Sequence, residues 1–173
     1  RHGTNRDGRN LDVLAEWRAP KTVSGGPYDA LLVAEQHGVL TALSFHDTPE
    51  ALAGIHRRFT EANPQGRVWL YESWLSVDNK DDPSRWIAYE RAASPVWQCV
   101  ALRASRTLEA QGKAWAIDAV PSGAALAALV ERAMKQQVPG ISAATTRETM
   151  NRLFTDDVHL TPLGHYYMAS VVY

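Results

Sequence analysis

Three short hydrophobic runs alternate with segments of helical periodicity, and this alternation constrains the fold more than any other feature of the chain. The runs cover residues 28–34, 67–74 and 114–119. The first is a continuous apolar stretch bounded by polar residues, which is typical of a strand buried on both faces of a parallel sheet. Because strands that alternate with helices build a parallel sheet flanked by helices, the sequence predicts an α/β domain.

The segments between and after these runs carry clear helix boundaries. In Asp47-Thr48-Pro49-Glu50, we expect Asp47 to cap a helix that ends at Asn63-Pro64. Residues 83–111 are predicted to form two consecutive helices, because Pro83 and Ser94-Pro95 both resemble helix starts. Further helices are expected at 11–18, after a capping Ser122, around 147–153, and from Thr161-Pro162 to the C-terminus.

Helical periodicity also predicts which side chains are buried. His56 stands beside two arginines and is expected on a solvated helix face. The terminal helix is expected to bury Leu163, Tyr167, Met168 and Val171.

Length, charge and composition limit the class of protein. With 173 residues, 45% of them hydrophobic, the chain is expected to form one domain spanning residues 1–173. Its 18 basic and 19 acidic residues are spread along the chain, which argues against a nucleic-acid-binding surface. No window comes near the roughly 18 uninterrupted apolar residues of a membrane span, and the single Cys99 excludes an internal disulfide framework. A small molecule or neutral polymer is the expected partner, while compartment and oligomeric state are left open.

The feature that bears most directly on function is Asp156-Asp157-Val158-His159, near the C-terminus. A carboxylate beside an imidazole fixes the tautomer of the ring and leaves the other ring nitrogen to take a proton from a serine. Asp156 and His159 are therefore the candidate orienting residue and general base. Asp157 is expected to face solvent or to bind backbone amides at the start of the following helix.

This motif, followed by Leu160-Thr161-Pro162-Leu163-Gly164, resembles the fifth sequence block of the SGNH hydrolases, also called the GDSL esterase family. The run YDALLVAEQ, followed by HDTPEALAGIHRRFTEANPQGRVWLYESW, is similar to a bacterial branch of that family. The resemblance implies a three-layer, flavodoxin-like α/β domain with a mostly parallel sheet. It also implies a carboxylic-ester hydrolase of the esterase, lipase or carbohydrate deacetylase type, which acts on a small-molecule, glycan or lipid ester without a cofactor. In such an enzyme Asp156 would orient His159, and His159 would be the general base.

The sequence departs from the family pattern at the nucleophile. None of its serines follows a hydrophobic strand in a GDS-like or GHS-like sequence, and Ser24 precedes its strand. We therefore expect the first strand and the nucleophilic serine to lie upstream of Arg1. By the same resemblance, Gly3 is placed like the second-block glycine, whose backbone N–H donates to the oxyanion.

A second departure concerns the oxyanion hole. Where the family has an asparagine after the next strand, this chain has Ala34-Glu35-Gln36-His37-Gly38. Gln36 can present a similar side-chain amide, whereas an ionised Glu35 would repel the oxyanion, and losing one such donor costs on the order of 10²-fold in rate. The second hypothesis is therefore a catalytically impaired SGNH-like domain that binds an acylated glycan or lipid without turning it over.

Other polar and aromatic residues allow alternative interpretations. Zinc or manganese accepts ligands of the kind found in Asp156, Asp157, His159 and His165. No helix motif of a metal enzyme accompanies them, so no metal site is predicted. His165 is expected at a surface or core position, and His37 and His46 in ordinary loop contacts. Trp74, at the end of the second hydrophobic run, is expected to border a substrate cleft.

Overall fold

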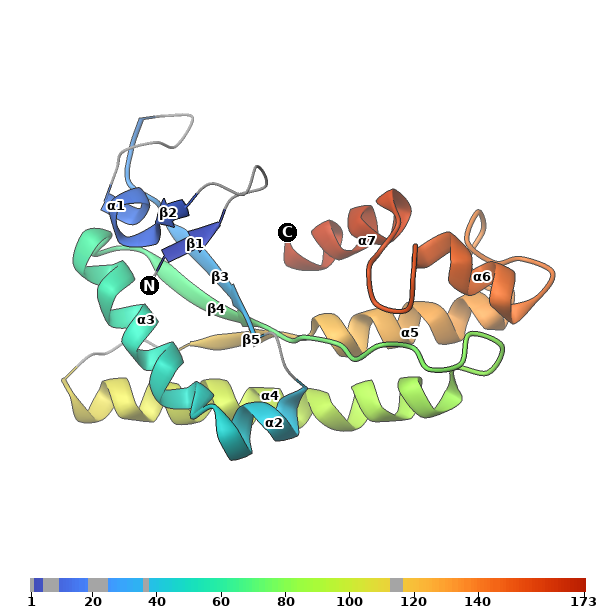
Figure 1. Cartoon of the computed structure of the whole chain (residues 1–173), viewed down its shortest axis with the longest axis horizontal. Helices are drawn as coiled ribbons and strands as arrows, with labels where there is room; N and C mark the ends of the chain where they lie inside the picture. Colours follow the sequence, from blue (N-terminus) through green and yellow to red (C-terminus); the bar gives the residue numbers. More distant parts are fainter. Residues whose placement is uncertain (1, 5–9, 19–24, 36–37, 113–116) are drawn as a thin grey trace.

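The centre of the molecule is a parallel sheet of three strands. The computed structural model describes residues 2–4, 10–18, 25–35, 38–112 and 117–173 (Figure 1). The strand order is β3-β4-β5, with β3 at Ala30–Ala34, β4 at Arg67–Tyr71 and β5 at Asp118–Val120. Ala30 is in register with Arg67, and Trp69 with Asp118. The predicted mixed α/β fold with a parallel sheet is confirmed.

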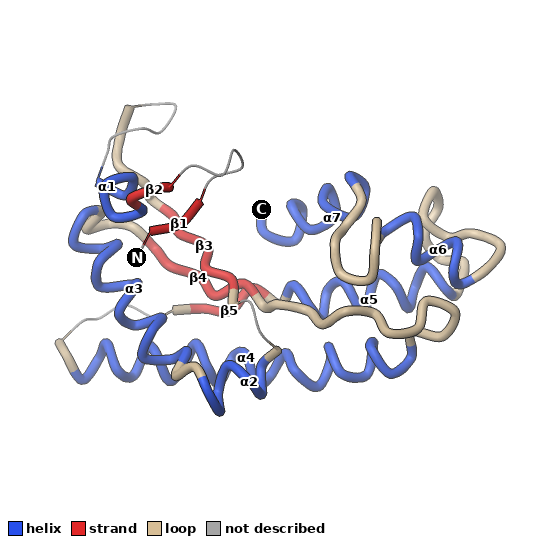
Figure 2. Tube along the Cα trace, viewed as in Figure 1, coloured by secondary structure: helices blue, strands red, loops and turns tan. Residues whose placement is uncertain are grey.

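Helices connect the strands and extend beyond the sheet (Figure 2). Between β3 and β4 lie α2 (Val39–Phe45) and α3 (Thr48–Ala62), and between β4 and β5 lies α4 (Ser84–Ala110). After β5 come α5 (Ser122–Met134), α6 (Thr146–Leu153) and α7 (Pro162–Val172). The described N-terminal elements are the antiparallel pair β1 (His2–Thr4) and β2 (Asn10–Asp12), and α1 (Val13–Arg18).

The two faces of the sheet are covered unequally. Leu31, Val33, Val68 and Leu70 face α3 and α4 and join a core with Phe59, Trp97, Val100 and Leu108. Side chains alternate along a strand, so Leu32 lies on the opposite face, where it is 42% exposed. Within the described residues β3 pairs with β4 alone, and its burial alternates between exposed and half-buried. The prediction that this strand is buried on both faces is therefore wrong.

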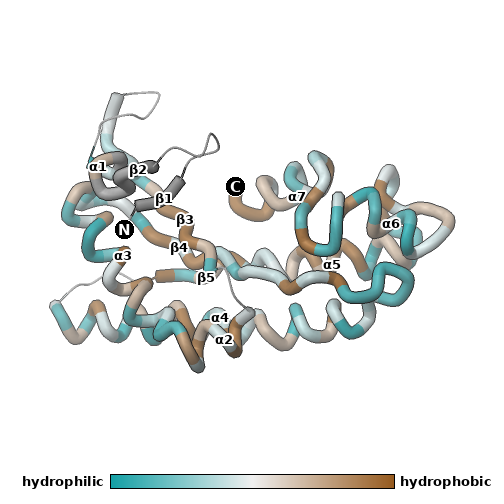
Figure 3. The backbone as a smooth tube through the Cα atoms, viewed as in Figure 1, coloured by the Kyte–Doolittle hydropathy of each residue, from teal (hydrophilic) through white to brown (hydrophobic). Residues whose placement is uncertain are grey.

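A second hydrophobic core lies beyond the sheet, where α5, α6 and α7 meet the first part of α4. Trp86 of α4 and Phe154 pack edge to face with ring centroids 5.8 Å apart. The buried members of this core also include Leu126, Val130, Met150, Leu153, Leu160 and Met168. In Figure 3 hydrophobic colour marks β4 and the C-terminal end of α7. Because α4 contributes to both cores, it joins the sheet to the helical part of the molecule.

Residues 84–110 form one helix, and the prediction of a second helix start at Ser94-Pro95 is wrong. Pro95 lies inside α4, where it removes one backbone hydrogen bond. Ser94 is buried, and its hydroxyl donates to Glu72 Oε1 at 2.7 Å. Burial of this helix in two cores outweighs the local signal for a break.

Two predicted side-chain helix caps are also wrong. Asp47 has a left-handed backbone (φ 45°) and makes no side-chain cap, whereas the hydroxyl of Thr48 donates to Glu35 Oε2 at 2.8 Å. Ser122 is the first residue of α5, and its hydroxyl donates to the carbonyl of Glu72 at 2.6 Å. The helices themselves lie where the sequence predicts them.

Burial predictions fail at two positions. His56 is 1% exposed and belongs to the inner face of α3, and Leu163 is 39% exposed although α7 buries Met168. Within the described residues, no helix combines the length and apolar character needed to cross a bilayer.

Candidate functional site

Asp156 and His159 are in direct contact in the loop between α6 and α7. Asp156 Oδ2 lies 2.7 Å from His159 Nδ1, the distance of a charge-assisted hydrogen bond. Asp156 Oδ1 accepts from the backbone N–H groups of Val158, at 2.8 Å, and His159, at 2.7 Å. Both carboxylate oxygens are therefore engaged, and the spacing of three residues brings the carboxylate to the imidazole.

The local sequence closes this loop tightly. The backbone N–H of Thr155 donates to the carbonyl of His159 at 2.8 Å, and Phe154 bridges Leu160. Thr161 caps α7 by accepting from the N–H of Gly164, and its hydroxyl donates to Arg152 O at 2.6 Å.

Gly164 lets the first turn of α7 lie against the end of α6. A Cβ at this position would be 2.6 Å from the carbonyl oxygen of Leu153, too close for any side chain. The run Thr-Pro-Leu-Gly after the histidine thus has a packing reason: it starts a helix and brings that helix close to its neighbour.

The segment that follows β4 holds the loop from the other side. In Figure 1 this segment runs from the end of β4 past α5 to the start of α4. The indole N–H of Trp74 donates to Val158 O at 2.9 Å, and the backbone N–H of Val77 donates to Asp157 O at 2.7 Å. Trp74 therefore anchors the loop, a role that sequence reasoning missed, although its place at the end of β4 was the signal.

The pair is open to solvent, and its electrostatics favour a charged aspartate. The side chain of Asp156 is 57% exposed and that of His159 is 77% exposed. The backbone N–H groups of His159 and Val158, followed by the imidazole, hold the pKa of Asp156 well below its usual range. Asp156 thus stays anionic at neutral pH and can orient the ring, while His159 Nε2 makes no hydrogen bond to another described residue.

Of the predicted oxyanion residues, the one that the structure describes, Gly3, is not brought to this pair. Gly3 lies in β1, paired with Leu11, and in Figure 1 this hairpin is well separated from the loop between α6 and α7. Gln36 and His37 lie outside the described residues. The hydroxyl of Thr48 holds the carboxylate of Glu35, and no described serine is hydrogen bonded to His159.

Asp157 and His165 take separate positions. Asp157 is exposed, and its carboxylate lies 3.9 Å from Lys80 Nζ. His165 borders a shallow apolar hollow on the face of the sheet that carries Leu32, formed with Leu32, Tyr71, Met168, Ala169, Val172 and Tyr173. Among the described residues no three His, Cys, Asp or Glu side chains gather as a metal site.

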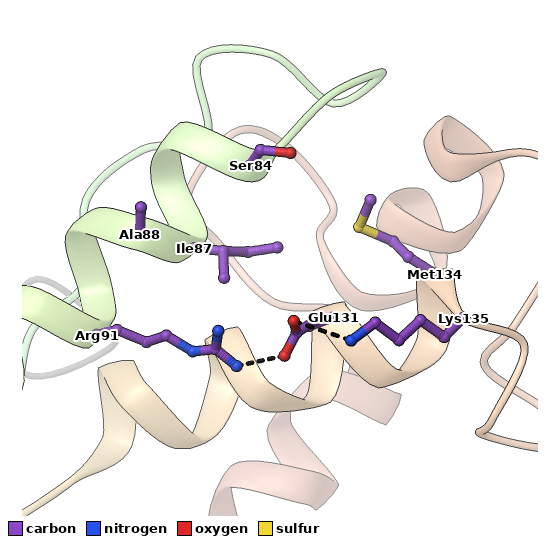
Figure 4. A pocket seen from close by; sticks show the side chains of 7 residues that line it. All are labelled: Ser84, Ile87, Ala88, Arg91, Glu131, Met134 and Lys135. Atoms are coloured by element: carbon purple, nitrogen blue, oxygen red, sulfur yellow. Dashed lines mark hydrogen bonds and ion pairs between the residues drawn. The ribbon is translucent and has the colours of Figure 1, made fainter.

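A second hollow lies between α4 and α5 (Figure 4). Its floor holds Glu131 between Arg91 and Lys135, with Glu131 Oε1 3.0 Å from Lys135 Nζ and an ion pair to Arg91 on the other side. These two cations lower the pKa of Glu131. Since one carboxylate already engages both cations, we interpret these residues as an ion-pair network that joins two helices and not as a binding site.

Comparison with models of known protein families, with curated proteins and with solved structures gives no match to this chain. The functional assignment therefore rests on the residues of the loop and their geometry.

Proposed function

We propose that this chain is a carboxylic-ester hydrolase of the SGNH type, in which Asp156 and His159 form the base half of a serine relay. The contact of 2.7 Å between Asp156 Oδ2 and His159 Nδ1, on an exposed loop, carries the proposal. A carboxylate on one ring nitrogen stabilises the tautomer whose other nitrogen accepts a proton.

In this mechanism a serine hydroxyl attacks the ester carbonyl while His159 Nε2 takes its proton. His159 then gives that proton to the leaving alcohol, so the C–O bond to the alcohol breaks and an acyl-serine remains. Water, deprotonated by the same nitrogen, releases the acid. Asp156 stabilises the imidazolium that forms twice in the cycle.

The serine belongs, in this proposal, to a strand that adds to the open edge of β3 and completes a three-layer, flavodoxin-like sheet. Two observations support this arrangement. Leu32 on β3 is 42% exposed, and within the described residues β3 has a strand partner on one side only. The segment that follows β4 at the carboxyl end of the sheet contacts the Asp156–His159 loop, and this end is where parallel sheets place their ligands.

The apolar hollow beside His165 supports a substrate with an acyl group, attached to a small alcohol, a glycan or a lipid. Gln36 remains a proposed oxyanion donor, whereas Gly3 is not proposed for this role, because the β1–β2 hairpin lies apart from the loop between α6 and α7. The alternative proposal is a binding domain for the same acylated ligands without turnover. The carboxylate of Glu35 favours it, because this group stands at the end of β3 where the family has an asparagine.

The test is hydrolysis of short-chain aryl esters by the full-length protein and its His159→Ala variant, with His165→Ala as the matched control. We expect His159→Ala to lose on the order of 10³-fold or more in kcat and His165→Ala to keep the activity. Equal rates for wild type and His159→Ala would overturn the assigned base. Binding of an acylated glycan or lipid with no turnover by the wild type would instead support the alternative.

A further inference from the structure

Two glutamates lie buried side by side, away from the Asp156–His159 loop. Glu72 directly follows β4, and Glu90 is in the first half of α4. Their residues are 0% and 1% exposed, which makes them the most deeply buried acidic residues of the described chain. Carboxylates are rarely buried so completely, because losing water penalises the charged form strongly.

Each glutamate has one oxygen engaged and one without a partner. Glu72 Oε1 accepts from the hydroxyl of Ser94 at 2.7 Å, and Glu90 Oε1 accepts from the backbone N–H of Leu75 at 2.8 Å. The Oε2 atoms of both residues are buried and make no hydrogen bond.

The two unpartnered oxygens face the same small space at the start of α5. A Cβ on Gly123 would lie 2.7 Å from Glu90 Oε2 and 3.8 Å from Glu72 Oε2. A side chain at this position would force the carboxyl group of Glu90 to shift. The absence of a side chain on Gly123 thus brings two acids together against the first turn of a helix.

The surroundings of the pair compensate a negative charge on Glu72 better than one on Glu90. Burial raises the pKa of both groups, and the charge of Glu72 raises that of Glu90 further, to about 7. The hydroxyl of Ser94 lowers the pKa of Glu72, and so do the backbone N–H groups of Gly123 and Ala124, which lie near its carboxyl group although Oε2 has no partner within hydrogen-bond geometry.

The other titratable groups next to the pair are tyrosines. Tyr71 from β4 lies beside Ser122 of α5, and Tyr89 from α4 senses the charge of Glu90. Burial raises the pKa of both phenols, so both stay neutral. No described Lys, Arg or His side chain is hydrogen bonded or ion-paired to either glutamate.

We infer that Glu72 and Glu90 form a proton-binding pair, which holds one proton in weakly acidic solution and releases it as the pH rises through neutrality. Two neighbouring carboxyl groups in a buried site cannot both ionise without a large electrostatic cost, so the first remains charged and the second stays protonated. When the second proton leaves, the repulsion loosens the junction of β4, α4 and α5.

This junction also supports the loop that carries Asp156 and His159. The carboxyl group of Glu90 accepts from the backbone N–H of Leu75, and the indole N–H of Trp86 donates to Leu75 O at 2.8 Å. The neighbouring Trp74 holds Val158 O. Ionisation of the pair therefore acts on the segment that anchors the loop, whether or not the loop is catalytic.

The sign of the pH effect follows from the raised pKa of Glu90. The folded chain binds this proton more tightly than the unfolded chain, whose glutamate has a pKa of about 4.5. The stabilisation is fully present below that value, is lost as the pH rises to about 7, and is absent above it. Between pH 5 and pH 8 the folding equilibrium constant should fall on the order of 100-fold from this pair.

The test is denaturant unfolding of wild type and Glu90→Gln between pH 5 and pH 8, with Glu109→Gln as the control on an exposed part of the same helix. Glutamine keeps the acceptor for Leu75 and mimics the protonated acid. We expect the loss of stability with rising pH to disappear in Glu90→Gln and to persist in Glu109→Gln. At pH 8 the Glu90→Gln variant should therefore be more stable than the wild type. A pH dependence of Glu90→Gln equal to that of wild type would overturn the inference.

A measurement on the wild type decides the case if the variant does not fold. Carbon-detected NMR of the glutamate carboxyl groups should show one group that titrates near neutrality. The Trp74 indole resonance, assigned with Trp74→Phe, should shift with the same midpoint. Titration of every glutamate below about pH 5 would refute the pair.

Discussion

Asp156 beside His159 and Glu72 beside Glu90 are two acid sites that the same fold treats in opposite ways. Asp156 is exposed and receives two backbone N–H groups and an imidazole, so its pKa falls. Glu90 is buried, receives one backbone N–H group and faces another carboxyl group, so its pKa rises. Hydrogen-bond donors and access to water, and not residue type, therefore decide which of these carboxyl groups is ionised.

The two sites are connected through one segment. Leu75 contacts the buried pair and Trp74 contacts the exposed loop. The buried site thus supports the structure near the loop, while the loop presents the charged aspartate and its histidine to solvent. Substitutions at each site separate these two roles.

The largest effect is expected at the exposed site. Asp156→Asn in the full-length protein removes the charge that stabilises the imidazolium and should lower kcat for ester hydrolysis by on the order of 10⁴-fold. Asp157→Asn is the matched control, because its carboxylate lies in the same loop but near Lys80. Equal losses of kcat in both variants would mean that activity depends on the folded loop and not on the charge of Asp156.

At the buried site, Gly123→Ala should destabilise the fold by about 1–3 kcal/mol, since its Cβ would lie 2.7 Å from Glu90 Oε2. Gly54→Ala in α3 is the control, as its Cβ would meet only Arg57 at 3.7 Å. There, the better helix propensity of alanine should stabilise by about 0.5–1 kcal/mol. Urea unfolding of both variants measures these two changes. An unchanged free energy of unfolding in Gly123→Ala would contradict the described packing.

The connection between the sites is tested by Trp74→Phe. This change removes the hydrogen bond to Val158 O and should cost about 1 kcal/mol. Hydrogen exchange should report faster opening of the 155–160 loop. Trp69→Phe is the control, because that ring stacks under Arg67 on the sheet. An unchanged loop in Trp74→Phe would show that the backbone contact of Val77 suffices.

The smallest effect is the loss, at acid pH, of the contribution that Asp156 makes to stability. Its pKa is depressed in the folded chain, so its contribution is present above the ordinary value of 3.8 and is lost as the pH falls below it. Because the group is exposed, the effect is small. The stability difference between wild type and Asp156→Asn should shrink as the pH falls from 6 toward 2 (about the range of the aspartate titration), and a difference that grows would contradict the sign.

The parts of the fold that local chemistry dictates were predictable from the sequence. The sheet alternation, α3, α6 and α7 were expected near their observed bounds, and the spacing of Asp156 and His159 correctly indicated their contact. The failures are tertiary. Ser94 donates to Glu72 from within a helix, and Glu35 takes the hydroxyl of Thr48. Neither partner is close in sequence, so no local pattern could reveal them.

The buried pair escaped prediction for the same reason. Glu72 and Glu90 read as ordinary strand-end and helix residues, and only packing against Gly123 brings their oxygens together. Within the described residues β3 pairs on one side only, and this could not be predicted, because a run of apolar residues looks the same in an edge strand and in a central one.

The tautomer of neutral His159, read from the ring nitrogen shifts in a long-range ¹H–¹⁵N NMR spectrum, tests the central claim most directly. If Asp156 orients the ring for general-base chemistry, Nδ1 carries the proton and Nε2 is the free acceptor, and Asp156→Asn weakens this preference. A neutral ring protonated on Nε2 in the wild type, unaltered by Asp156→Asn, would contradict the account.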